Sequence, residues 1–88
     1  MEKIKVSANS RSVAVAGAVA GVLRDDAQVE IQTIGPHALN QAVKGLVVAR
    51  KYLQADGLDL VCTPGFTEVE IRGEERTAIR LLVERRLL

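Results

Sequence analysis

The sequence is poor in aromatic residues: it has no tryptophan, and its only aromatic side chains are Tyr52 and Phe66. Proteins that hold single-stranded nucleic acid by base stacking need several exposed rings, so a stacking platform is excluded. Cys62 and His37 are the only cysteine and the only histidine. One cysteine cannot form an intrachain disulfide, and the two residues cannot complete a four-ligand metal site within one chain. We therefore expect no metal and no cofactor.

An excess of one charge and a long hydrophobic run are also missing. Twelve basic and eleven acidic residues leave a net charge of +1, so any nucleic-acid contact must come from cations gathered locally. The longest apolar run, residues 13–23, is shorter than the ~20 residues that cross a bilayer. Residues 1–5 lack the apolar segment of a signal peptide. We expect a cytoplasmic protein without membrane contact.

The chain has 88 residues, and its hydrophobic share of 48% is too high for a disordered segment. We expect one domain over residues 1–88. A domain of this size buries only ~60–65% of the surface that its unfolded chain exposes, so its core is thin. Oligomerisation is a simple way to supplement such a core.

The hydrophobic period changes repeatedly along the first two thirds of the chain. Alternating residues predict strands, and apolar residues at i, i+4, i+7 and i+8 predict helices. Serines in the polar loop of residues 7–12 are suited to cap the helix that follows. The pattern predicts a strand at 3–6, a helix at about 13–26, a strand from Val29 that ends at Gly35, and a helix from Pro36 to about Gln54.

The last third is predicted to be β-structure. Apolar residues at 58, 60 and 62 share one strand face, whereas Val69 and Ile71 have the opposite parity. Because Pro64 and Gly65 lie between the two groups, we expect a bulge or bend inside one long strand. Residues 72–76 read as a charged hairpin loop, and a fourth strand is expected at about 79–83.

The order β-α-β-α-β-β predicts an α/β fold with two layers. Two right-handed crossovers place both helices on one face of a mixed four-stranded sheet, whose last two strands are antiparallel. The other face stays uncovered and mixes apolar with polar side chains: Val61, Thr67, Arg80, Leu82 and Glu84. We expect a homodimer because a second copy is the simplest cover for that face.

No group of residues predicts catalysis. His37 has no carboxylate or nucleophile nearby in sequence and is interpreted as a surface residue. Cys62 is interpreted as a small core residue, because it shares a strand face with apolar neighbours. Glu68 and Glu70 are interpreted as a solvated strand edge. Motifs for nucleotide binding and for a catalytic triad are missing, so we expect no enzymatic activity.

Two features suit phosphate binding instead. Gly35 and Pro36 leave free N–H groups from His37 onward at the start of the second helix, where the helix dipole favours an anion. The guanidinium fork of arginine binds two phosphate oxygens at once. Glu74 and Glu75 would repel phosphates, so a charge-balanced solubility loop is the alternative for the hairpin. The basic residues in question are Lys5 and Arg11 at the first loop, and Arg72 and Arg76 at the hairpin.

The segment IQTIGPHALNQAVK, residues 31–44, closely resembles the stage V sporulation protein S family. So do residues 5–8 (KVSA), 15–18 (VAGA) and 73–79 (GEERTAI), and the resemblance extends over nearly the whole chain. It implies a bacterial regulatory protein that is linked to sporulation in spore formers. It also implies a fold similar to that of the archaeal chromatin protein Alba, a dimer that binds DNA and RNA.

Alba-type proteins place basic residues after the first strand, at the start of the second helix and on the last hairpin. At the start of the second helix, this chain has Pro36 and His37 where those proteins tend to have arginine. We therefore expect a homodimer that binds the backbone of DNA or RNA weakly and without sequence specificity. The alternative is a protein–protein interaction module with the same fold. Transferred by position, the resemblance implies nucleic-acid contacts at Lys5, Arg11, His37, Arg72 and Arg76, and the free N–H groups of the second helix add Gly35 to the predicted site.

Overall fold

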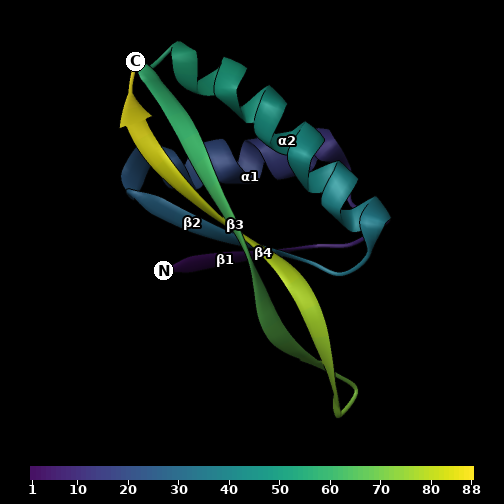
Figure 1. Ribbon diagram of the computed structural model, residues 1–88. Coiled ribbons are helices and arrows are strands. Elements are labelled where there is room, and N and C mark those ends of the chain that lie inside the picture. The colour runs from purple at the N-terminus through teal and green to yellow at the C-terminus, as the bar shows by residue number, and fades with distance from the viewer.

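The computed structural model describes residues 1–88 and contains the six predicted elements in the predicted order. They are β1 (Glu2–Val6), α1 (Ser12–Asp25), β2 (Gln28–Thr33), α2 (Pro36–Gln54), β3 (Leu58–Ile71) and β4 (Glu74–Leu87). The strands form one mixed sheet in the order β1-β2-β4-β3. β1 is parallel to β2, and β4 is antiparallel to both of its neighbours. Both helices cover one face of the sheet, which confirms the predicted two-layer fold (Figure 1).

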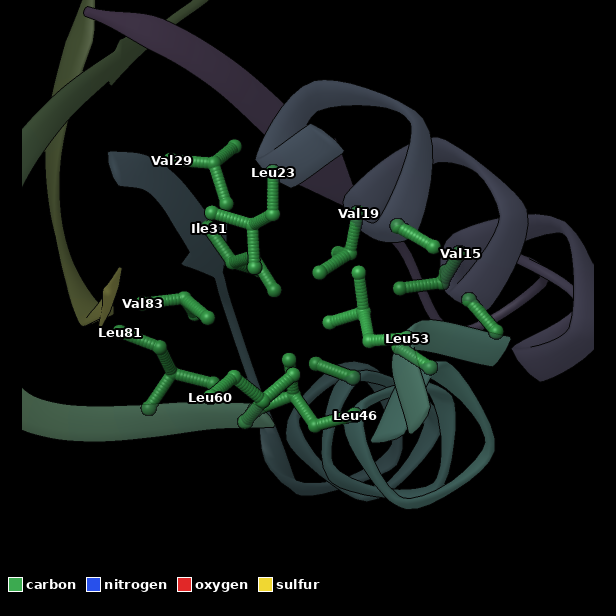
Figure 2. Packing of buried hydrophobic residues seen from close by; sticks show 14 of the residues in the cluster. Val15, Val19, Leu23, Val29, Ile31, Leu46, Leu53, Leu60, Leu81 and Val83 are labelled. Carbon is green, nitrogen blue, oxygen red and sulfur yellow. The ribbon is translucent and has the colours of Figure 1, made fainter. Parts of the chain in front are cut away.

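The core lies between the helices and the sheet. Val15, Val19 and Leu23 lie on one face of α1 because they are four residues apart. Alternate residues of β2 and β4 point toward them, as expected for strands with one covered face. Figure 2 shows the side chains of α1 packed against residues from the other elements of the core. These are Val29 and Ile31 of β2, Leu46 and Leu53 of α2, Leu60 of β3, and Leu81 and Val83 of β4.

The two helices pack tightly against each other at Gly45 of α2. A Cβ atom at this position would lie 2.7 Å from Cγ1 of Val15 and 3.2 Å from the carbonyl oxygen of Ser12. Because such distances are too short for carbon, only glycine allows the two helices this approach. Neither helix combines the length and the hydropathy that spanning a membrane requires.

β3 and β4 pair without interruption from Leu58↔Leu87 to Ile71↔Glu74. Pro64 lies opposite Leu81 within this regular register, so the predicted bulge is wrong. The proline is tolerated because β3 is an edge strand, where one missing N–H leaves no partner strand unpaired. The ribbon twists strongly instead (Figure 1). The apolar residues of β3 switch from one strand face to the other along the strand, because Val69 and Ile71 line a groove on the sheet face opposite the helices.

The predicted hairpin loop of residues 72–76 is also wrong. The turn consists of Arg72 and Gly73 alone, with φ angles of 52° and 77°. Two consecutive residues with positive φ form the tight hairpin turn whose twist matches that of the strands. Glu74, Glu75 and Arg76 therefore belong to β4 and have fixed partners in β3.

Candidate nucleic-acid interface

Three chain connections lie at the same end of the sheet. β3 runs in the same direction as β1 and β2, because it is antiparallel to β4, which is itself antiparallel to β2. The carboxyl ends of β1, β2 and β3 are therefore at one end of the molecule. All six residues that were predicted to contact nucleic acid lie at or beside these ends: Lys5, Arg11, Gly35, His37, Arg72 and Arg76.

The β3–β4 hairpin extends beyond the other strands as an arm, which we define as residues 67–78. The pairing of β2 with β4 stops at Thr33↔Ile79, so no third strand accompanies the arm. Its five residue pairs, from Thr67↔Ala78 to Ile71↔Glu74, span roughly 17 Å at 3.4 Å per residue. Figure 1 shows the arm projecting away from both helices, with the turn at its tip.

The regular pairing sorts the side chains of the arm onto two faces. Directly opposed residues of antiparallel strands share a face, and the faces alternate along each strand. Because Leu81 and Val83 face the helices, Thr77 and Glu75 of β4 lie on the same side, which we call the helix side. The opposite side continues the sheet face that has no helices, and we call it the open side.

The two sides of the arm differ in charge. On the helix side, Glu70 is directly opposite Glu75, and Glu68 accepts a 3.1 Å hydrogen bond from the hydroxyl of Thr77. No cation lies among these three carboxylates on that side. The open side of the arm carries one cation and one carboxylate among small and aliphatic residues: Thr67, Val69, Ile71, Glu74, Arg76 and Ala78.

Two grooves flank the arm. The open-side groove, about 280 Å³, lies between the arm and the end of β1 and is lined by Lys5, Val6, Ser7, Ala8, Gln32, Ile34, Val69, Glu70 and Ile71. The helix-side groove, about 360 Å³, lies between the arm and the start of α2 and is lined by Thr33, Gly35, Pro36, Leu39, Phe66, Thr77, Ala78 and Ile79. The structure thus places Lys5 and Gly35 in different grooves, with the arm between them.

The loop after β1 is held by its own serines. The backbone N–H of Ser7 donates a 2.9 Å hydrogen bond to Oγ of Ser10, and the Gln41 amide donates a 2.7 Å bond to the Ser10 carbonyl. Arg11 occupies the N-cap of α1 and makes no capping bond, so the predicted serine cap is wrong. Gly35 at the N-cap of α2 has no side chain to offer. Both helices therefore begin without a side-chain acceptor for their first N–H groups.

Arginines at the opposite end of the molecule are used for structure. Arg24 pairs with Asp56 at 2.9 Å, and Arg85 donates to the last carbonyls of α1, including that of Leu23 at 3.1 Å. Arg50 of α2 pairs with Asp59 of β3 at 2.8 Å. The pKa of Asp59 is lowered by this bond and by a further bond from the N–H of Leu60.

The cations near the arm are not engaged in this way. Lys5, Arg11, Arg72 and Arg76 form no ion pair and no side-chain hydrogen bond within the chain. Their side chains belong to exposed residues. His37 is likewise exposed, on the first turn of α2. Unpaired cations are free to bind an external anion.

A polar network on the open side of the sheet was missed at the sequence level. Glu30 is only 6% exposed, and it accepts bonds of 2.6 Å from Nε of Arg80 and from the amide of Gln32. The bond from Arg80 lowers the pKa of Glu30 despite the opposing effect of burial. The strand pattern signalled only that these residues share a face, because the partners are fifty positions apart.

Cys62 does not belong to the core, contrary to the prediction. It is exposed on the edge strand β3, although its backbone position is on the helix side of the sheet. The helices leave this part of the strand uncovered, because the core cluster includes Leu60 of β3 but none of the residues beyond it. Partial burial raises the pKa of the thiol, which disfavours the reactive thiolate.

The fold and the arm together define an Alba-like α/β protein. The solved structure of Alba from Thermoplasma volcanium superimposes with a TM-score of 0.61 and 12% sequence identity, over 96% of this chain and 98% of that chain. At this identity the likeness concerns the fold. The sequence model of the Stage V sporulation protein S family matches residues 2–86, so the chain belongs to that family.

Proposed function

We propose that this chain is a non-enzymatic regulatory protein that binds the backbone of DNA or RNA as a homodimer in the cytoplasm. The observation that supports this function best is the set of four unpaired cations at one end of the molecule: Lys5, Arg11, Arg72 and Arg76. Membership of the Stage V sporulation protein S family favours a role in sporulation or gene expression.

Binding of this kind is electrostatic and independent of sequence. Arg72 at the tip and Arg76 on the arm can each bind two phosphate oxygens, and Lys5 adds a point charge at the base. Between its two ends, the exposed side of α1 consists of small residues, among them Ala14, Gly17 and Ala18, which cannot read base edges in a major groove. We therefore expect contacts with phosphate and sugar only.

We propose that two copies pair along α2 and the outer edge of β3. Leu39 of α2 lines the helix-side groove together with Phe66 of β3. Arg50 of α2 pairs with Asp59 of β3. Val43 and Val47 lie on the same helix face, at 46% and 56% exposure, and Phe66 of β3 is 81% exposed. Covering these side chains releases ~25 cal/mol for each Å² of apolar surface.

This interface is favoured over the open sheet face that the sequence suggested. Lys3 and Lys5 of β1 are exposed on that face, and the pair of Glu30 and Arg80 lies beside them. A second copy would bring the same charges together and remove them from water, which is costly for charges that gain no partner.

A salt titration tests the backbone contact. We expect a short labelled duplex to bind at ~50 mM salt, with log K falling linearly as log salt rises. Four phosphate contacts per protomer make eight in the homodimer and predict a slope of about −7.2, since each contributes about −0.9. Fluorescence anisotropy measures both quantities. Absence of binding at that salt concentration, or affinity that does not change with salt, contradicts the proposal.

A charge-reversal pair separates nucleic-acid binding from the alternative of a protein-docking module. Arg72→Glu with Arg76→Glu changes the net charge by four, and so does Lys44→Glu with Arg86→Glu at two exposed positions away from the arm. We expect the arm variant to lose duplex binding and the control variant to retain most of it. An arm variant that binds duplex normally but loses a protein partner supports the docking module instead.

A further inference from the structure

We infer that the nucleic-acid backbone lies along the open side of the arm and the sheet, and that the carboxylates on the helix side of the arm keep it out of the groove beside α2. The inference rests on the proposed function and specifies its surface. It assigns opposite roles to the two sides of one hairpin, only a strand thickness apart.

The helix side of the arm is unsuited to a polyanion. Glu68, Glu70 and Glu75 lie within two residue pairs of one another, and no Lys or Arg on that side neutralises them. Like charges on neighbouring positions of a ladder already repel each other, and a phosphate would add to that repulsion. The helix-side groove itself contains no charged residue. A phosphate that approached the free N–H groups at the start of α2 would therefore have to pass these carboxylates.

The open side offers the complementary arrangement. Arg76 lies on this side of the arm, and Lys3 and Lys5 lie on the same side of β1. Lys5 and Ser7 line the open-side groove together with Val69 and Ile71, so arm and β1 share one continuous surface. Glu70 also borders this groove, whose lining therefore contains one cation, Lys5, and one carboxylate. Arg80, which is also on this side, is neutralised by Glu30. Glu74 is the carboxylate on this side that lies closest to the turn.

This division also separates two binding surfaces. Phe66 lines the helix-side groove and belongs to the apolar surface that we propose for pairing. A phosphate backbone in that groove would compete with the second copy. The acidic side of the arm prevents such competition, because it lies between the apolar groove and the cations at the tip and on the open side. Gly35 and His37 are then not the main phosphate contacts.

Two threonines of the arm provide a matched test. Thr67 lies on the open side opposite Ala78, and Thr77 lies on the helix side opposite Glu68. Thr67→Lys and Thr77→Lys each add one positive charge to neighbouring pairs of the same hairpin. We expect Thr67→Lys to tighten binding of a short labelled duplex about threefold or more at ~50 mM salt and to steepen the salt slope by about 0.9 for each protomer. We expect Thr77→Lys to change affinity less than about twofold, with the same slope as the parent protein.

The outcomes distinguish this inference from the proposed function. If the parent protein does not bind duplex at all, the proposed function fails and the inference fails with it. If it binds, and Thr77→Lys steepens the slope as much as Thr67→Lys or more, the assignment of sides is wrong while the function stands. Should Thr67→Lys fail to fold in a thermal melt, Lys5→Gln against Lys44→Gln replaces the test. Only loss of affinity at Lys5 supports the open side.

Discussion

Glu30 and Arg80 show how a charged residue is accommodated inside a sheet. Glu30 is almost fully covered by its neighbours, yet each of its carboxylate oxygens accepts a short hydrogen bond. A buried charge is tolerated when it is paired and its lone pairs are satisfied. The pair joins β2 to β4 at the centre of the open face.

The pair should make stability depend on pH. Arg80 lowers the pKa of Glu30 in the folded protein. The contribution of the pair to folding stability is therefore complete above the ordinary glutamate pKa of ~4.3, and it is lost as the pH falls through the lowered pKa. We expect Glu30→Gln to lower the free energy of unfolding by about 1 kcal/mol at neutral pH, with a smaller difference in acid. Urea unfolding at several pH values measures this. A difference that stays constant from neutral to acid pH contradicts it.

Glycines of the two helices should respond oppositely to the same substitution. At Gly45 a Cβ would meet Val15, so Gly45→Ala should destabilise the protein by about 1–3 kcal/mol. At Gly17 a Cβ would meet nothing within 4 Å, so Gly17→Ala should stabilise α1 by about 0.5–1 kcal/mol. Thermal melts of both variants suffice. Destabilisation by Gly17→Ala would reveal a contact of α1 with another molecule.

Among the elements, the arm departs most from its sequence pattern. Charge and glycine in residues 72–76 resemble a flexible loop, but pairing across the hairpin extends to Ile71↔Glu74 and leaves a turn of two residues. Propensity is weak in strands compared with cross-strand pairing, so composition could not predict this extension. The helices were easier, and α2 begins and ends where the pattern of Pro36 to Gln54 predicts.

Arg72 occupies a turn position that suits asparagine better. Its φ of 52° is costly for most side chains, by about 1–2 kcal/mol, and asparagine tolerates it more easily. We expect Arg72→Asn to raise the free energy of unfolding by about 0.5–1 kcal/mol and to weaken duplex binding. Urea unfolding and anisotropy test the two effects separately. As a control, Gly73→Ala should destabilise, because Gly73 has a φ of 77°. A loss of stability in Arg72→Asn contradicts the argument.

At the scale of the whole molecule, the positive and negative charges nearly cancel, but the unpaired cations are distributed unevenly. Arg24, Arg50 and Arg85 are held in ion pairs or hydrogen bonds, so they contribute little to binding an external anion. Eight Lys and Arg side chains form no ion pair or hydrogen bond within the chain, and four of them lie at the end that bears the arm: Lys5, Arg11, Arg72 and Arg76. A net charge of +1 is therefore compatible with a local phosphate-binding surface.

The proposed pairing surface predicts which apolar substitution dissociates the dimer. Val47 on α2 and Val13 on α1 are equally exposed, at 56%, but only Val47 belongs to the pairing surface that we propose. We expect Val47→Glu to yield monomers in sedimentation equilibrium and Val13→Glu to leave the dimer intact, because a charge in an apolar interface loses its water. Monomeric parent protein, or dissociation by both variants, contradicts this interface.

Local periodicity was sufficient to predict the six elements, their order and the two-layer fold, because apolar spacing reflects which side of each segment is covered. The positions of Cys62 and Glu30 could not be predicted in this way, since exposure depends on how far the helices reach over the sheet and on partners distant in the chain. The two charged sides of the arm likewise arise from the β3–β4 register. A shift of one residue would exchange every side chain between them, so only tertiary pairing decided which cations face outward together.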